Sequence, residues 1–413
     1  MGLGMAEYIH NYKKHYDNYV SNLKKDKCIS ETNKKLIFEF ERACYLNQKL
    51  ELPTRIKYFD VLGKITKRYV NKDLDKLTRK DFENIILKIE SKDEWSVATK
   101  HKHKVLLKKF GKWLKYKNKS FNERKHEYPE TVSWINTNIK RKEMKLVMAS
   151  DILNEEEVEK LIKSAEHPRD KAFISMLYEL GARIGEIGNL RIKDITRDEY
   201  SYLVDLNGKT GRRTPRIVMS DPYITTWLNQ HPLKNDPEAP VWTAIGNRKA
   251  EKLDYRALSN IIRRIKDKTG IKKRVYAHLF RHSRVTHLLS NRQINESQAK
   301  VYFGWVPSSK VLSEYSHLVS NDVNDAILEL NNIKPKNNRE TLKPKICPSC
   351  RKINIKDALF CQNCSKPLDF NTAVTFDKKK RSYEDALKNV LKNDGKVREI
   401  IMKALMKEGV DFE

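Results

Sequence analysis

Hydrophobic residues recur every three or four positions along most of the chain, which is the spacing of amphipathic α-helices. The clearest early run has its apolar positions at Tyr58, Val61, Leu62, Ile65 and Tyr69. Similar runs follow around residues 82–89 and after residue 96. Strict alternation of apolar and polar positions, typical of a half-buried strand, occurs over residues 200–206. We therefore predict a mainly α-helical protein with a small antiparallel β-sheet, an α+β fold.

Changes in composition divide the first part of the chain into three segments. Residues 1–30 are polar, with tyrosines at helical spacing, and are predicted to be an N-terminal extension. Residues 31–125 carry the helical runs and are predicted to be a helical, DNA-binding domain. Residues 126–149 are polar and basic, so we predict a linker to the next domain.

A second domain is predicted over residues 150–332. Asn154 with Glu157 three positions later is a capping-box pattern at the start of a helix. Residues 207–211 form a predicted turn between two strands, with Lys209 at its tip. Further helices are predicted over the ranges 172–180, 255–269, 278–290, 296–303, 308–315 and 321–330.

The charge balance points to a polyanionic partner. The 413 residues include 83 Lys and Arg against 54 Asp and Glu, a formal net charge of +29 that is spread over most of the chain. Nucleic acid is the usual partner of such a chain, and simple solubility or an acidic protein partner are the alternatives. No apolar run is long enough to span a membrane, and no secretory signal is visible, so we expect a cytoplasmic, nucleoid-associated protein.

Lysines lie between the apolar positions of the helix predicted after residue 96. This spacing suggests contacts with DNA phosphates, which give affinity but read no sequence. The alternative for any single lysine is a solvated helix face. The candidate DNA-binding residues are Lys100, Lys102, Lys104, Lys108, Lys109 and Lys112.

Two CxxC pairs follow a basic linker at residues 333–345. Four thiolates at this spacing are the ligands of a structural zinc site, so we predict a zinc ribbon over residues 346–370. Free thiols or a redox pair are the alternatives. The four predicted ligands are Cys347, Cys350, Cys361 and Cys364. Residues 371–413 are predicted to be a helical tail that either caps the ribbon or joins subunits.

Residues 277–315 concentrate groups suited to phosphoryl transfer. Guanidinium groups can hold both non-bridging oxygens of a phosphodiester in the transition state, as Arg183 and Arg281 would. A tyrosine such as Tyr315 can attack the phosphorus, and a lysine such as Lys209 can protonate the leaving oxygen. His278 or Trp305 would add a neutral donor. Taken singly, each of these residues is more often structural, and only the set carries the hypothesis.

These motifs resemble those of the tyrosine recombinases, the phage-integrase family. Residues 181–190 (GARIGEIGNL) are similar to the family's first arginine box, and residues 278–282 (HLFRH) are similar to the second. Gly304-Trp305, the lysine of residues 207–213 (NGKTGRR) and Tyr315 match the remaining positions in order. The C-terminal cysteines resemble the zinc-ribbon tails of some archaeal integrases.

The resemblance implies a catalytic set and a reaction. Arg183, Lys209, His278, Arg281 and Trp305 would surround the scissile phosphate, and Tyr315 would attack it. Glu186 and His282 would support these residues. The family implies a homotetramer on specific double-stranded DNA sites, a 3′-phosphotyrosine link and a Holliday junction, with neither ATP nor a catalytic metal. A type IB topoisomerase-like enzyme and a non-catalytic zinc-ribbon DNA-binding protein are the alternative functions.

The sequence departs from the family pattern in three places. Phe280 stands where leucine is usual, and Trp305 replaces the commoner histidine, which keeps a donor but removes a titratable group. The interval from Gly304 to Tyr315 is slightly long and contains Pro307.

Overall fold

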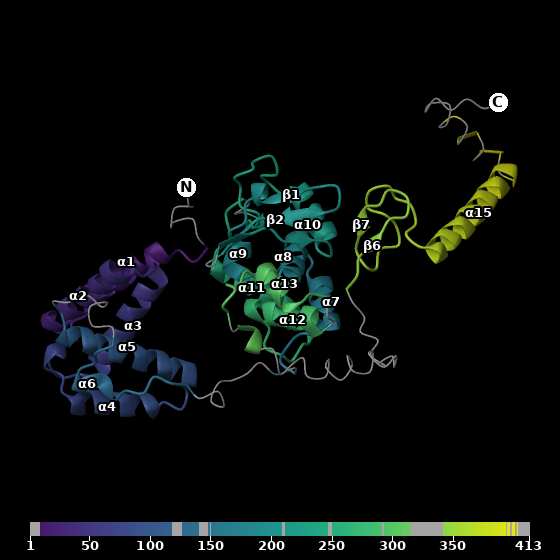
Figure 1. Cartoon of the computed structure of the whole chain (residues 1–413). Helices are drawn as coiled ribbons and strands as arrows, with labels where there is room; N and C mark the ends of the chain where they lie inside the picture. The colour runs from purple at the N-terminus through teal and green to yellow at the C-terminus, as the bar shows by residue number, and fades with distance from the viewer. Residues whose placement is uncertain are drawn as a thin grey trace, which may run out of the picture. The chain divides into compact units, whose positions relative to one another are not determined.

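The computed structural model of the chain forms two compact units, Met1–Met148 and Ala149–Glu413 (Figure 1). It describes residues 9–117, 126–139, 148, 150–208, 211–246, 250–290, 293–309, 311–314 and 342–393, and then residues 395, 396, 399, 400 and 403. Within these ranges, no helix is both long enough and apolar enough to span a membrane.

The first unit is all helical in its described part. Its helices are α1 (Tyr12–Lys25), α2 (Glu31–Gln48), α3 (Leu52–Tyr69), the 3₁₀ turn η2 (Leu74–Lys76), α4 (Arg79–Glu90), α5 (Val97–Lys115) and α6 (Glu130–Ser133). The side chains of Ser30, Thr78 and Ser96 accept hydrogen bonds from backbone amides in the first turns of α2, α4 and α5. Such caps fix where these helices begin.

Two segments that the sequence analysis placed outside the helical domain belong to its core. Leu23 of α1 is 7% exposed, and Val132 of α6 and Ile135 are 0% and 1% exposed. All three join the same apolar cluster as Phe40 and Phe110. Burial of these apolar side chains therefore joins α1 and residues 130–135, which lie in the segments predicted as extension and linker, to the core of the helical domain.

The second unit is built around α8. Its helices are α7 (Glu155–Ser164), α8 (Pro168–Glu179), α9 (Ile184–Gly188), the 3₁₀ turn η4 (Ile192–Asp194), α10 (Asp221–Gln230), α11 (Tyr255–Thr269), α12 (Ala277–Ser290), α13 (Glu296–Phe303) and the 3₁₀ turn η6 (Val311–Glu314). α8 packs against α7, α10 and α12 and is buried over ten of its residues (Figure 1). The predicted capping box at Asn154 and Glu157 forms at the start of α7.

The predicted hairpin divides into two small antiparallel sheets. Strands β1 (Ile195–Arg197), β2 (Tyr202–Val204) and β5 (Arg216–Ile217) form one sheet in the order β1-β2-β5. Strands β3 (Leu206–Gly208) and β4 (Gly211–Arg213) form the other. The ladder breaks between them because the Asp205 amide donates to the Asp194 carbonyl (2.8 Å) and Pro215 has no amide hydrogen to donate.

The C-terminal part begins with a short hairpin and continues as a long helix. Strands β6 (Lys345–Ile346) and β7 (Ile353–Asn354) pair, and α15 covers Phe370–Asn393. Contacts join this hairpin region to α7 of the same unit: the Leu342 amide donates to Glu155 (2.7 Å), and Lys163 pairs with Asp357 (2.6 Å). The helix predicted over 321–330 lies outside the described residues, and the 3₁₀ turn η6 stands in the range predicted as a helix over 308–315.

Candidate active site

Arg281 joins three parts of the second unit. Its side chain is 2% exposed and lies on α12. Its Nη1 donates to the Gly181 carbonyl (2.9 Å) at the end of α8, and its Nη2 donates to the Phe303 carbonyl (2.8 Å) at the end of α13. One guanidinium therefore ties the first arginine box, which begins at Gly181, to the second box and to the segment that leads to Trp305.

Arg183 lies at the start of α9, two residues beyond the Gly181 carbonyl that Arg281 binds. Gly181 has φ of 50°, the left-handed conformation that ends α8 and turns the chain toward α9. The Arg183 side chain is 36% exposed, and its Nη1 donates to Glu186 Oε1 at 2.7 Å. Glu186 therefore contacts Arg183 directly, while part of the Arg183 side chain faces solvent.

Glu186 is a shared partner. Its side chain is 3% exposed, and Oε2 accepts from the Arg183 amide (3.1 Å) and from Arg213 Nη2 (2.8 Å). Although burial opposes its ionisation, the hydrogen bonds and positive charges of Arg213 and Arg183 hold the pKa of Glu186 below its usual range. A carboxylate between two guanidiniums stays ionised, so the group keeps a net positive charge.

His278 and His282 lie one turn apart on α12, with ring centroids 4.6 Å apart and planes at 88°. The pKa of His278 is lowered to about 4, first because surrounding atoms remove part of its hydration, and then because His282, Arg281 and Arg183 are cations or potential cations nearby. The pKa of His282 is lowered for the same first reason and by Arg281. His278 is therefore neutral near pH 7 and can act as a neutral hydrogen-bond donor.

Trp305 follows directly after α13. Gly304 has φ of 62°, the left-handed conformation that ends the helix, and the Trp305 amide donates to the Lys300 carbonyl at 2.8 Å. The guanidinium carbon of Arg281 lies 5.1 Å from the centroid of the Trp305 ring and 5.3 Å from that of Phe303. Arg281 and Trp305 are therefore neighbours, as the predicted site requires.

Two predicted catalytic residues, Lys209 and Tyr315, lie outside the described residues. The strands that flank Lys209 pair with each other, with Gly208 opposite Gly211. The 3₁₀ turn η6 ends one residue before Tyr315, and its Val311 and Leu312 pack on the apolar cluster that contains Phe303.

A second tyrosine, Tyr302, packs against this cluster and could be considered as an alternative nucleophile. The Tyr302 hydroxyl donates to the Glu179 carbonyl at 2.9 Å. Burial raises the pKa of Tyr302 to about 12. A phenol that is buried, hydrogen-bonded and hard to ionise is a poor nucleophile.

Arg213 belongs to the group of charged residues around Glu186, and it was not among the residues predicted from the sequence. It lies on β4, donates from Nε to the Tyr302 carbonyl (3.0 Å), and binds Glu186 through Nη2. Its position four residues after Lys209, on the predicted hairpin, was the available signal. Burial of the side chain, which is 8% exposed, was not visible in the local pattern.

The six candidate DNA-binding lysines of α5 differ in their surroundings. Lys108 donates to the carbonyls of Ser133 and Ile135, and Lys109 donates to Gln48 and Tyr58. Lys112 is 7% exposed, and its ammonium lies 4.5 Å from the centroid of the Tyr128 ring. Lys104 pairs with Glu90 (2.7 Å), and Lys100 donates to the Glu90 carbonyl. Lys102 is exposed. Contacts within the first unit thus engage five of the six ammonium groups.

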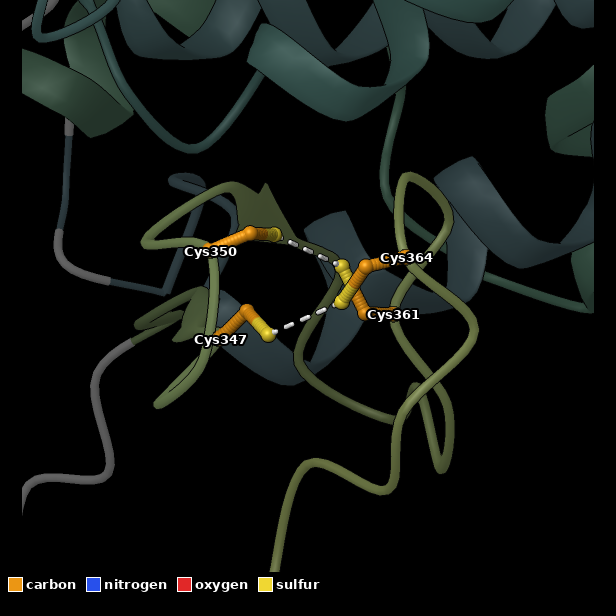
Figure 2. A group of neighbouring side chains, drawn as sticks. All are labelled: Cys347, Cys350, Cys361 and Cys364. Atoms are coloured by element: carbon orange, nitrogen blue, oxygen red, sulfur yellow. Dashed lines mark hydrogen bonds between the residues drawn. The ribbon is translucent and has the colours of Figure 1, made fainter.

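The four cysteines of the C-terminal ribbon face one another from two loops (Figure 2). The Sγ atoms of Cys347 and Cys364 are 3.6 Å apart, those of Cys350 and Cys361 are 3.5 Å apart, and all four lie within 4.8 Å of one another. A tetrahedral site with metal–sulfur bonds of about 2.3 Å has sulfur–sulfur edges of about 3.8 Å. The four thiols therefore fit a single metal ion.

Both cysteine loops repeat one backbone pattern. The amide four residues after the first cysteine donates to that cysteine's carbonyl: Arg351 to Cys347 (3.0 Å) and Ser365 to Cys361 (2.9 Å). Arg351 and Ser365 both have positive φ, 58° and 55°. Two equivalent turns thus present two thiols each to the same point, an arrangement suited to holding a metal.

The second unit is similar to known proteins. A model of the phage integrase family matches residues 151–321. Residues 151–321 are therefore similar to the phage integrase family, the tyrosine recombinases, whose motifs this sequence resembles. The matched range contains every residue predicted to be catalytic, from Arg183 to Tyr315, whereas the first unit and the cysteine ribbon lie outside it.

Curated tyrosine recombinases match this chain over part of their length. Tyrosine recombinase XerA of Pyrococcus furiosus is 34% identical over 140 residues, which are 33% of this chain and 47% of the relative. A tyrosine recombinase of Thermosipho africanus is 31% identical over 183 residues, 44% of this chain and 62% of the relative. The chain spans about half the length of the first curated relatives it matches.

Solved structures share the fold over a larger part of the chain. The XerH site-specific recombinase bound to palindromic difH substrate matches with a TM-score of 0.53 and 20% identity, over 78% of this chain and 97% of that one. A lambda integrase dimer bound to a COC′ core site matches with a TM-score of 0.51 and 15% identity, over 68% and 76%. The predicted α+β fold, mostly helical with small antiparallel sheets, is confirmed.

Proposed function

We propose that the protein is a site-specific DNA recombinase, an integrase that cleaves and rejoins DNA through a 3′-phosphotyrosine intermediate. The observation that carries the proposal is the bridge made by Arg281, which holds the start of the first arginine box and the end of α13 on either side of one guanidinium. This bridge gathers Arg183, His278 and Trp305 around Arg281, and residues 151–321 match the phage integrase family.

In the proposed cleavage step, the phenol oxygen of Tyr315 attacks the phosphorus and the bond to the 5′ oxygen breaks. Arg183 and Arg281 hold the two non-bridging oxygens, where charge develops. Neutral His278 and the indole N–H of Trp305 donate further hydrogen bonds. Lys209 gives a proton to the 5′ oxygen as it leaves.

Rejoining is the reverse of cleavage. The 5′ hydroxyl of a partner strand attacks the phosphotyrosine, so the energy of the phosphodiester is kept in the ester and ATP is not needed. Two rounds of exchange between two sites pass through a Holliday junction. We propose a homotetramer on two specific double-stranded sites, acting on chromosomal DNA in the cytoplasm; lambda integrase has been seen as a tetramer on a Holliday junction.

The first unit and the ribbon have supporting roles in this proposal. The first unit would bind DNA phosphates, with Lys102 as the exposed lysine of the predicted set. Cys347, Cys350, Cys361 and Cys364 would hold one Zn²⁺, because four thiols within 4.8 Å of one another favour it and leave no open position for substrate. The metal would stabilise the ribbon fold and take no part in phosphoryl transfer.

A nicked suicide substrate tests the proposal, because loss of the short strand after cleavage traps the covalent adduct. Tyr315→Phe lacks the nucleophilic oxygen and should form no adduct while still binding DNA in a mobility-shift assay. Tyr302→Phe is the matched control, since its hydroxyl is bonded to the Glu179 carbonyl, and it should keep adduct formation. An undiminished adduct in Tyr315→Phe refutes the assignment.

An assay of strand exchange distinguishes the proposed recombinase from a topoisomerase-like enzyme. Two sites on one plasmid should give recombinant products of defined size. Relaxation of supercoils without any recombinant product would favour the topoisomerase-like alternative.

A further inference from the structure

Arg213 makes two contacts that belong to different parts of the candidate active site. Its Nη2 donates to Glu186 Oε2 (2.8 Å), and Glu186 in turn holds Arg183. Its Nε donates to the Tyr302 carbonyl (3.0 Å) at the end of α13, one residue before the Phe303 carbonyl that Arg281 binds. Two arginines therefore bind successive carbonyls at the end of the helix that leads to Trp305.

The hairpin that carries Arg213 lies unusually close to this ion pair. A side chain at Gly208 on β3 would bring a Cβ to 2.4 Å from Glu186 Oε1. A side chain at Gly304 would bring a Cβ to 3.0 Å from Arg213 Nη1, and Gly304 has φ of 62°. Strand β3 thus approaches Glu186 at a distance that glycine permits, and β4 contacts Glu186 through Arg213. Lys209 directly follows Gly208 in the chain.

The contacts of Arg213 go beyond what a structural ion pair requires. Its Nη1 is buried and has no hydrogen-bond acceptor among the residues that the structure describes. A buried N–H without a partner is unfavourable, so stability alone does not favour an arginine here. The shape of the guanidinium explains why arginine stands at this position. Its planar group contacts both Glu186 and the Tyr302 carbonyl, which a lysine ammonium would not do.

We propose that Arg213 is a positioning residue for the proton transfer assigned to Lys209. It fixes strands β3 and β4, which flank Lys209 in the chain, to the Glu186–Arg183 pair and to the end of α13. The inference rests on the proposed function, in which Lys209 protonates the 5′ oxygen. Arg213 itself touches neither the substrate nor the reacting atoms.

This role predicts a specific defect when Arg213 is changed. Attack by Tyr315 and charge stabilisation by the arginines persist, while proton transfer from Lys209 to the departing 5′ oxygen slows. General acid catalysis contributes about 10²- to 10⁴-fold, so a misplaced lysine should cost at least about tenfold in cleavage rate. A leaving group that needs no proton should restore that loss, because a thiol is far more acidic than an alcohol and sulfur leaves as a thiolate.

The test compares single-turnover cleavage of two suicide substrates, one with oxygen and one with sulfur at the bridging 5′ position. The variants are Arg213→Gln, Arg213→Lys, Lys209→Ala and the double variant Lys209→Ala/Arg213→Gln. Arg212→Gln is the matched control, because Arg212 is the neighbouring arginine on β4, is 75% exposed and pairs with Asp205. Thermal unfolding of each variant reports whether it is folded.

The expected result is a loss of at least about tenfold for Arg213→Gln on the oxygen substrate and recovery to within about threefold of wild type on the sulfur substrate. Arg213→Lys should behave like Arg213→Gln, and Arg212→Gln like wild type. The double variant should cleave at the rate of Lys209→Ala, since both changes remove the same proton transfer.

Two outcomes overturn the inference in distinguishable ways. If Lys209→Ala is rescued by sulfur and Arg213→Gln is not, Arg213 supports the fold only and the inference fails while the proposed function stands. If Lys209→Ala itself is not rescued, the proposed role of Lys209 fails and the inference fails with it. A double variant slower than Lys209→Ala on both substrates also counts against the inference.

Discussion

The candidate active site and the cysteine ribbon are assembled over different distances in the chain. Arg281 binds the carbonyl of Gly181, 100 residues away, whereas the outermost cysteines of the ribbon are 17 residues apart. Local hydrogen bonds form the two equivalent turns of the ribbon, and a bound metal would hold the four thiols together. The active site instead depends on side chains that bind backbone carbonyls of distant elements. Single changes should therefore disrupt the active site from many positions but the ribbon only at its thiols.

The largest effect is expected for Arg281→Lys. A lysine keeps the charge, but its ammonium does not present the planar fork that reaches both the Gly181 and Phe303 carbonyls. Cleavage of a suicide substrate should fall by about 10²- to 10³-fold, the size expected when a transition-state donor is lost. Single-turnover kinetics measures the rate, and a thermal melt should show lower stability. Arg274→Lys, at an exposed arginine just before α12, should change neither. An Arg281→Lys protein that cleaves at the wild-type rate would show that the bridge is not needed.

Removal of the metal is expected to have a smaller, local effect. Elemental analysis of wild-type protein should find about one equivalent of zinc, and Cys347→Ser should lose it because three thiolates leave the tetrahedron open. Cys28→Ser, at an exposed cysteine of the first unit, should keep the metal. Cleavage by Cys347→Ser should fall by less than about tenfold, because separate sites contribute independently. Metal-free wild-type protein would refute the zinc site.

The smallest effect concerns the pH dependence of stability. The pKa of His278 is about 4 in the folded chain and about 6.5 for an unperturbed histidine. Between these values the unfolded state binds a proton that the folded state does not, so the free energy of unfolding should decrease as pH falls from about 6.5 toward 4. Denaturant unfolding at pH 5 and 7 should show a smaller difference in His278→Gln than in wild type. His126→Gln, at an exposed residue of the first unit, should leave the difference unchanged. An equal pH dependence in His278→Gln and wild type would contradict the lowered pKa of His278.

Sequence alone was enough for the regular elements and for the local site. Helices α11 and α13 have the predicted bounds, because Gly270 and Gly304 end them and Asn295 caps the start of α13. The cysteine spacing was sufficient to predict four thiols around one point. Local patterns of this kind depend on residues only a few positions apart.

Contacts between elements that are distant in the chain could not be predicted from local sequence patterns. Arg183 and Arg281 were grouped by the chemistry of phosphoryl transfer and by the family resemblance, not by a local pattern. The contacts of Arg213 were not predicted, because its partners are a carboxylate and a backbone carbonyl 27 and 89 residues away. The lysines of α5 were predicted to form one DNA-binding face, yet several bind carbonyls, hydroxyls or carboxylates of the first unit. A repeated charge fixes the face of a helix but not the partner of each side chain.

The central claim is that Tyr315 becomes joined to DNA in a site organised by two distant arginines. The most direct test traps the adduct on a nicked suicide substrate, digests it with protease and identifies the DNA-linked peptide by mass spectrometry. We expect a 3′ phosphate attached to Tyr315. Attachment to Tyr302 or to any other residue would contradict it.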